Sequence, residues 1–377
     1  MKVKRRRQRR CFCMAFDRKE LEFTKRGPNF VDITKPGPPI YQFPITAKEE
    51  AARMYRQKGS MWMPYGVEIG IFTPQIIPDN IARGFVFEKN MMSPDKYGGK
   101  DMFGVEWEYV PVVGGSMEKP GVPHLLNDIS EWRDKIVWPD INSWDWDQSG
   151  RDNYEFLHNG QCNSFWFLNG AGFERIISFL GFEQAAVTLI DEDSTDDLKE
   201  LLQKLADLHI QLIDAACETY GDGIDSFTYH DDWGSQKAPF FSRDVAREIF
   251  VPFQRQITDH IKAKGKFADL HSCGHIELQI ENIVAAGWQS WTPMAMNDTR
   301  QLYKDWGDKI VISVCDDPLP ADATPEEQKA QAVRFVKEYY SPDRPSQFSL
   351  YSNANLTDAY VEGLYETSRE MYESGTK

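Results

Sequence analysis

From about residue 160 onward, short apolar runs alternate with longer amphipathic segments. The segment 195–220 has the clearest pattern, because its leucines recur at the three- and four-residue spacing of one helix face and Gly221 suits the position after a helix end. Strand-like runs such as 162–168, 224–230 and 266–272 stand between segments of this kind. About six strand–helix alternations predict βαβ units and a parallel sheet.

An open doubly wound sheet and a closed barrel both fit this alternation. No G-x-G-x-x-G follows an early strand and no Walker A motif is present, which weakens the case for a nucleotide-binding open sheet. We therefore predict an α/β fold, a single (β/α)8 TIM-type barrel over residues 61–377, with its first two strands in the aromatic-rich N-terminal third. Before it we expect a basic tail at 1–13 and an irregular, aromatic-rich N-terminal extension at 14–60, in which a helix begins after Thr46.

Composition narrows the possible partners. The formal net charge of −15 argues against binding nucleic acid or an anionic membrane surface through the main body. The sequence contains no run of 18 apolar residues, so we expect no membrane-spanning helix. Six irregularly spaced cysteines in 377 residues favour free thiols in a reducing cytoplasm over a disulfide framework.

The first thirteen residues differ from the rest of the chain. They hold seven Lys or Arg and no acidic residue, so the remainder carries −15 − 7 = −22. A nucleic-acid or membrane-surface tail is one interpretation, and a secretory signal is excluded because no apolar stretch follows. We favour a solvated tail, or a translation start at Met14, and expect residues 1–13 to be dispensable.

Polar and metal-binding side chains gather where the predicted strands end. In a barrel these carboxyl ends meet at one rim, where the chemistry of the fold is carried out. The strand ends read "YHDDWG" at 229–234, "HSCGH" at 271–275, "CDDP" at 315–318 and "YSNAN" at 351–355.

The HSCGH segment suggests a zinc site. Residues two apart in a strand point to the same face, so His271 and Cys273 can share one ion. Zn²⁺ prefers imidazole and thiolate ligands, and three protein ligands leave an open position for catalysis. We expect Cys315 to be the third ligand. The alternative is a buried core cysteine beside a hydrogen-bonded histidine.

The DDWG segment supplies the predicted proton-transfer group. Adjacent strand residues point to opposite faces, so one carboxylate should face the mouth, and we favour Asp232 over Asp231. Glu106 is a second catalytic candidate. The side chains that we expect to bind substrate are Trp62, Asp101, Trp107, Tyr229, His230, Trp233, Gln236 and Asn353.

These motifs in this order resemble the uroporphyrinogen decarboxylase-like superfamily, in its corrinoid-dependent methyltransferase branch. The resemblance runs from about Met61 to the C-terminus. It is strongest over 221–318, through "YHDDWG", "DLHSCGH" and "VISVCDDP", while "DMFGVEW" resembles a loop after an early strand. The resemblance implies a (β/α)8 barrel and a zinc held by the His271–Cys273 pair and a later Cys. The later Cys usually lies at the final strand, which here has none, so Cys315, Glu106 or an Asp takes its place.

The resemblance implies movement of a methyl group between a small methylated substrate, or a thiol acceptor, and the cobalt of a corrinoid. No DxHxxG-type motif is present, so we expect the corrinoid on a partner protein. The alternatives are a uroporphyrinogen decarboxylase, disfavoured because "GSMWMPYGVEIG" has no Arg, and a non-catalytic ligand-binding barrel.

Overall fold

The main sheet is parallel, as the strand–helix alternation predicts. The computed structural model describes residues 14–28, 35–112 and 114–375. Within these residues the sheet has seven strands in the order β3-β7-β8-β9-β10-β11-β12, so neighbours in sequence are neighbours in space. The strands are β3 (Ile69–Phe72), β7 (Cys162–Phe167), β8 (Ser226–His230), β9 (Phe267–Ser272), β10 (Ser290–Pro293), β11 (Val311–Val314) and β12 (Gln347–Phe348).

One backbone hydrogen bond links the two edges of this sheet. The Phe348 N–H in β12 donates to the Pro64 carbonyl, at 2.8 Å, a few residues before β3. The barrel-type fold is confirmed, and among the described residues the N-terminal third supplies one parallel strand rather than the expected two.

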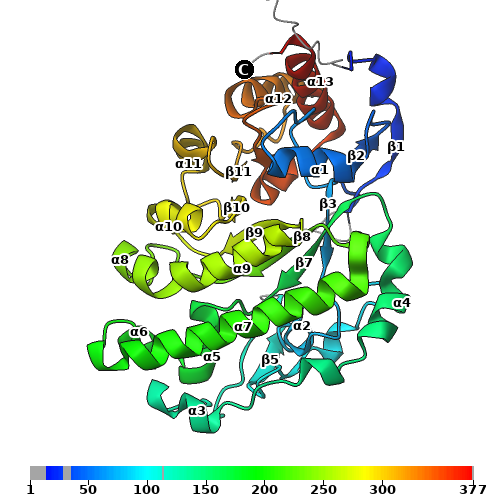
Figure 1. The fold of residues 1–377 in the computed structure, drawn as a ribbon. Helices are drawn as coiled ribbons and strands as arrows, with labels where there is room; N and C mark the ends of the chain where they lie inside the picture. Colours follow the sequence, from blue (N-terminus) through cyan, green and yellow to red (C-terminus); the bar gives the residue numbers. More distant parts are fainter. Residues whose placement is uncertain (1–13, 29–34, 113, 376–377) are drawn as a thin grey trace, which may run out of the picture.

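Helices cover the outer face of the sheet (Figure 1). Phe165 and Phe167 of β7 contact Tyr220 and His209 of the long helix α7, so the alternate residue Trp166 faces the barrel interior. No helix among the described residues is long and apolar enough to cross a membrane. The helices after β7 are α5 (Phe173–Leu180), α6 (Phe182–Thr188), α7 (Thr195–Tyr220), α8 (Arg243–Val245), α9 (Val251–Ala263), α10 (Ile280–Ala285), α11 (Thr299–Trp306), α12 (Pro325–Tyr339) and α13 (Asp358–Ser374).

A long insertion separates β3 from β7. It contains a three-stranded antiparallel sheet in the order β4-β5-β6. This sheet accounts for much of the aromatic, glycine-rich region. The elements of the insertion are α2 (Pro78–Ala82), β4 (Gly98–Lys100), β5 (Glu106–Val110), β6 (Gly115–Glu118), α3 (Trp132–Lys135) and α4 (Trp146–Leu157).

The N-terminal extension packs against the C-terminal helix (Figure 1). Buried Glu20 accepts hydrogen bonds from Arg369 Nε at 2.7 Å and from the Tyr365 hydroxyl at 2.7 Å, both on α13. The predicted tail at 1–13 lies outside the described residues. The extension contains β1 (Phe23–Arg26), β2 (Pro39–Tyr41) and α1 (Ala47–Tyr55), and Thr46 caps α1 as the sequence predicts.

Removing one partner of the Glu20–Arg369 pair should destabilise the fold strongly. The Arg369 side chain is 0% exposed, so Arg369→Ala leaves a buried carboxylate without its cation. We expect the free energy of unfolding to fall by about 3–5 kcal/mol. Arg18→Ala is the control, because Arg18 is 76% exposed in its pair with Glu366 and should change stability by less than about 1 kcal/mol. Urea unfolding of both variants tests this, and equal effects would contradict it.

Candidate metal centre

Two histidines and a cysteine meet at the carboxyl ends of β8 and β9. The parallel register sets His230 directly opposite His271, with ring centres 5.1 Å apart. Cys273 directly follows the end of β9, and its Sγ lies 3.5 Å from His271 Nε2 and 3.9 Å from His230 Nε2. One ligand atom from each of the three residues lies within 4.8 Å of the others. We call His230, His271 and Cys273 the three-ligand cluster.

Both imidazole rings are oriented through their other nitrogen. His271 Nδ1 lies 3.3 Å from the Thr292 carbonyl oxygen, and His230 Nδ1 lies 2.7 Å from Glu174 Oε2. A ring that donates from Nδ1 to a carbonyl or carboxylate keeps its Nε2 lone pair free, as metal-binding histidines commonly do. The Nε2 atoms of both rings lie near Cys273 Sγ, so the donor set can hold one ion once His230 has given up the proton on its Nε2.

The donor spacing fits zinc. With Zn–S near 2.3 Å and Zn–N near 2.0–2.1 Å, a tetrahedral site separates sulfur from nitrogen ligands by about 3.6 Å. The two S–N separations of 3.5 and 3.9 Å bracket this value. Two imidazoles and one thiolate also match the ligand chemistry of zinc, and they leave the fourth position open.

Glu174 depends on a second group of residues. It is the second residue of α5, and its backbone N–H donates to Asp231 Oδ1 at 3.0 Å. Its Oε1 lies 3.3 Å from both terminal nitrogens of Arg83, which also donates to Asn169 Oδ1. His230 therefore contacts the Glu174 carboxylate, which in turn pairs with the Arg83 guanidinium.

Burial and neighbouring charges perturb the cluster. Burial and the nearby His230 lower the pKa of His271 to about 4, which keeps this imidazole neutral and able to bind a metal. Burial lowers the pKa of His230, but the carboxylates of Glu174 and Asp232 raise it more, so the net pKa lies well above the usual range. Burial also raises the pKa of the Cys273 thiol. Such opposed shifts at one rim are typical of functional sites.

The two aspartates of the DDWG segment face different surroundings. Asp232 Oδ1 accepts the Cys273 N–H at 2.6 Å and lies 3.7 Å from His230 Nε2, at the cluster. Asp231 is buried and accepts the indole N–H of Trp233 at 2.8 Å and the Gln254 amide at 3.1 Å. A Cβ on Gly172 would collide with the Asp231 carboxylate, so glycine is required there.

The two carboxylates also differ in pKa. Burial raises the pKa of Asp231 to about 7. Burial raises that of Asp232 too, but His230 and the Cys273 N–H lower it more, and the net pKa lies below the usual range. Asp232 is therefore an ionised acceptor at neutral pH rather than a ready proton donor.

Aromatic rings stand beside the cluster. The Trp166 ring lies 6.4 Å from the His271 ring and 6.0 Å from Phe85. The Trp166 N–H is buried and has no hydrogen-bond partner among the described residues. Burial raises the pKa of Tyr351, and nearby acidic groups, Asp232 among them, raise it further. No motif in the sequence points to Trp166, Phe85 or Glu174, because only the folded chain brings them beside His230 and His271.

Cys315 and Glu106 are not part of the cluster. Among the described residues the groups able to hold a metal are His230–His271–Cys273 and Glu174–His230–Asp232, and neither includes Cys315 or Glu106. The structure thus brings His230, which was expected to bind substrate, beside His271 and Cys273. Glu106 lies on β5 and pairs with Lys119 at 3.2 Å.

Most residues expected to contact substrate are instead buried and bonded within the protein. Trp62 donates to Glu68, Asp101 pairs with Arg175 and accepts from Trp107, the Tyr229 hydroxyl meets His209, and Trp233 donates to Asp231.

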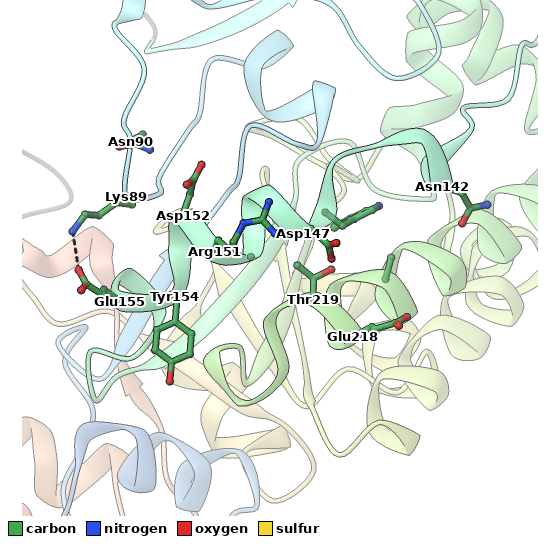
Figure 2. A pocket seen from close by; sticks show the side chains of 13 residues that line it. Lys89, Asn90, Asn142, Asp147, Arg151, Asp152, Tyr154, Glu155, Glu218 and Thr219 are labelled. Carbon is green, nitrogen blue, oxygen red and sulfur yellow. Dashed lines mark hydrogen bonds and ion pairs between the residues drawn. The ribbon is translucent and has the colours of Figure 1, made fainter.

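Two other expected contacts lie on loops at the strand ends. Gln236 is exposed in the turn after β8, and Asn353 is half-buried in the 3-10 segment Leu350–Asn355 after β12. A hollow with a volume of about 1140 Å³ lies elsewhere, between α4 and the end of α7 (Figure 2). It is lined by charged side chains such as Lys89, Asp152 and Glu155, and it contains no residue of the three-ligand cluster.

Comparison with known proteins places the fold. No family model and no curated sequence matches the chain. Among solved structures, a methyltransferase from Methanosarcina mazei matches with a TM-score of 0.57 and 12% sequence identity, over 85% of this chain and 99% of that one. At this identity the match shows a shared fold.

The third metal ligand can be identified by substitution. If His230 binds the ion, His230→Ala should weaken zinc affinity by at least about 10-fold, because a direct ligand is lost. Cys315→Ser should leave the affinity unchanged, since Cys315 is outside the cluster. Competition with a chromogenic chelator measures both. A loss in Cys315→Ser with normal affinity in His230→Ala would restore the Cys315 assignment.

Proposed function

We propose that the protein is a methyltransferase that moves a methyl group between a small methylated substrate, or a thiol acceptor, and the cobalt of a separate corrinoid protein. The observation that carries the proposal is the three-ligand cluster at the carboxyl ends of β8 and β9. The shared fold with a methyltransferase supports it, as does the position of the cluster at the end of the barrel where chemistry is found.

We further propose that His230, His271 and Cys273 hold zinc. A bound zinc would turn a coordinated thiol into a thiolate, or polarise the heteroatom that carries the methyl group. Glu174 and the Thr292 carbonyl orient the two imidazoles toward the ion. The cytoplasmic location and the corrinoid partner stay predictions from the sequence.

The protein's own residues would orient the substrate and move its proton. Asp232 is ionised and faces the cluster, so it can accept the proton of an approaching thiol or hydroxyl. Trp166 and Phe85 form an apolar wall beside His271. The unpartnered Trp166 N–H offers one donor to a substrate acceptor atom.

A methyl-transfer assay tests the proposal. Zinc-loaded protein is mixed with a reduced free corrinoid and each of a set of methyl ethers, methylamines and methyl thioethers, and methylcobalt formation is followed by absorbance. The reverse reaction is run with methylcobalamin and small thiols. We expect turnover in at least one direction that falls when zinc is removed. Zinc-replete protein inactive in both directions would contradict the methyltransferase assignment.

Substitution of Asp232 should mainly lower methyl transfer, whereas substitution of Asp231 should mainly lower stability. Asp232→Asn removes the carboxylate that faces the cluster, so we expect methyl transfer to fall by about 10²–10⁴-fold with the melting temperature unchanged. Asp231→Asn is the comparison, because Asp231 accepts buried donors. It should reduce stability by about 1–3 kcal/mol, with a smaller loss of activity in the folded fraction. Full activity in Asp232→Asn would remove Asp232 from the mechanism.

A further inference from the structure

We infer that Arg83 is a positioning residue that sets the affinity of the three-ligand cluster for its metal by fixing Glu174. This inference rests on the proposed zinc site and adds a residue from the β3–β7 insertion, far from the cluster in sequence. Arg83 directly follows α2 and does not belong to any of the metal-binding groups.

The two oxygens of Glu174 have separate partners. Oε2 meets His230 Nδ1 at 2.7 Å, whereas Oε1 meets both terminal nitrogens of Arg83 at 3.3 Å. The Glu174 side chain is 9% exposed, so water cannot replace a lost partner easily. Without Arg83, this carboxylate would lose its cation and could rotate away from the imidazole that it orients.

Two further residues, Trp107 and Asn169, contact the Arg83 guanidinium. Its guanidinium lies 4.8 Å from the centre of the Trp107 ring, and it donates to Asn169 Oδ1. Asn169 in turn donates to Asp79 at 3.1 Å. A planar guanidinium can stack on the Trp107 ring while it donates hydrogen bonds to the Asn169 amide oxygen and the Glu174 carboxylate. A lysine ammonium cannot make all three contacts.

The supports of Arg83 belong to one buried network. Asp79 and Asp101 both pair with Arg175, the residue after Glu174, and Asp101 also accepts the Trp107 indole N–H at 3.2 Å. The Arg175, Asp79 and Asp101 side chains are at most 2% exposed. The network therefore joins the antiparallel sheet to the start of α5 and, through Glu174, to His230. This gives Asp101 and Trp107 a supporting role behind the site.

The test is zinc affinity in a double-mutant cycle. Arg83→Met keeps an apolar stem under Trp107 and removes the charge and its donors. We expect it to weaken zinc binding about 10-fold, in the range usual for outer partners of metal ligands. Glu174→Gln should weaken zinc binding by a similar factor. The double variant should lose little more than Glu174→Gln alone, because Arg83 acts through Glu174.

A spectrum gives a readout that does not depend on turnover. Co²⁺ bound in place of zinc should show an altered visible spectrum in Arg83→Met, since the His230 ring is less well oriented. Arg133→Met is the matched control, because Arg133 also bridges two carboxylates, Asp197 and Glu200, but on the surface. It should change neither affinity nor spectrum.

The outcomes are distinct. Unchanged zinc affinity in folded Arg83→Met, or fully additive losses in the double variant, would overturn the role of Arg83 while leaving the metal site in place. A wild-type protein that binds no zinc would overturn both the metal site and this inference.

If Arg83→Met does not fold, Arg83→Lys replaces it as the test, because this variant keeps the positive charge. We expect a loss of about 3-fold or more in zinc affinity, because the lysine cannot hold both Asn169 and Glu174. Normal affinity in Arg83→Lys would then count against the inference.

Discussion

The pairing of β8 with β9 in one register determines where every proposed metal ligand lies. His230 and His271 are 41 residues apart in the chain, yet the parallel ladder sets them side by side. A slip of one residue would turn His271 and Cys273 toward the helices and put Leu270 and Ser272 in the barrel. The register is fixed by Phe227, Tyr229 and Leu270, which must face the outer helices. Packing on one face thus positions the chemistry on the other.

Buried charge is compensated around this site at each step. Glu174 lies between His230 and Arg83, and Arg175 lies between Asp79 and Asp101. Both central residues begin the same helix, α5, whose entry is set by the buried Asp231. An uncompensated charge in such a place costs several kcal/mol, so these residues are constrained as a group. The insertion between β3 and β7, which looks irregular in sequence, supplies three of these four partners, namely Asp79, Arg83 and Asp101.

Local patterns in the sequence predict the fold well. Strand–helix alternation predicted the parallel sheet, and the Thr46 cap occurs where expected. Pro252 lies in the first turn of α9, and a π-helical turn over Ala246–Phe250 directly precedes that helix. The strand at the start of the barrel was harder to find, because the aromatic residues around it pack irregularly and lack periodicity.

The sequence predicts the candidate site only where its residues lie close together along one strand. His271 and Cys273 follow from period-two alternation, and Asp232 faces the cluster for the same reason. Which residue lies beside this pair as a candidate third ligand depends on which strands are neighbours in the sheet. His230 lies on the strand next to His271, whereas β11, which leads to Cys315, is two strands from β9. Trp62 and Trp233 were expected to bind substrate, and the structure buries both, with their indole N–H groups donating to Glu68 and Asp231.

X-ray absorption at the zinc edge tests the central claim most directly. The protein would be purified without chelators and compared with its His230→Ala variant. The account predicts one zinc with two nitrogen ligands near 2.0–2.1 Å and one sulfur ligand near 2.3 Å, and one nitrogen fewer in the variant. A spectrum with two sulfur ligands, or a wild-type protein without zinc, would contradict the cluster of His230, His271 and Cys273.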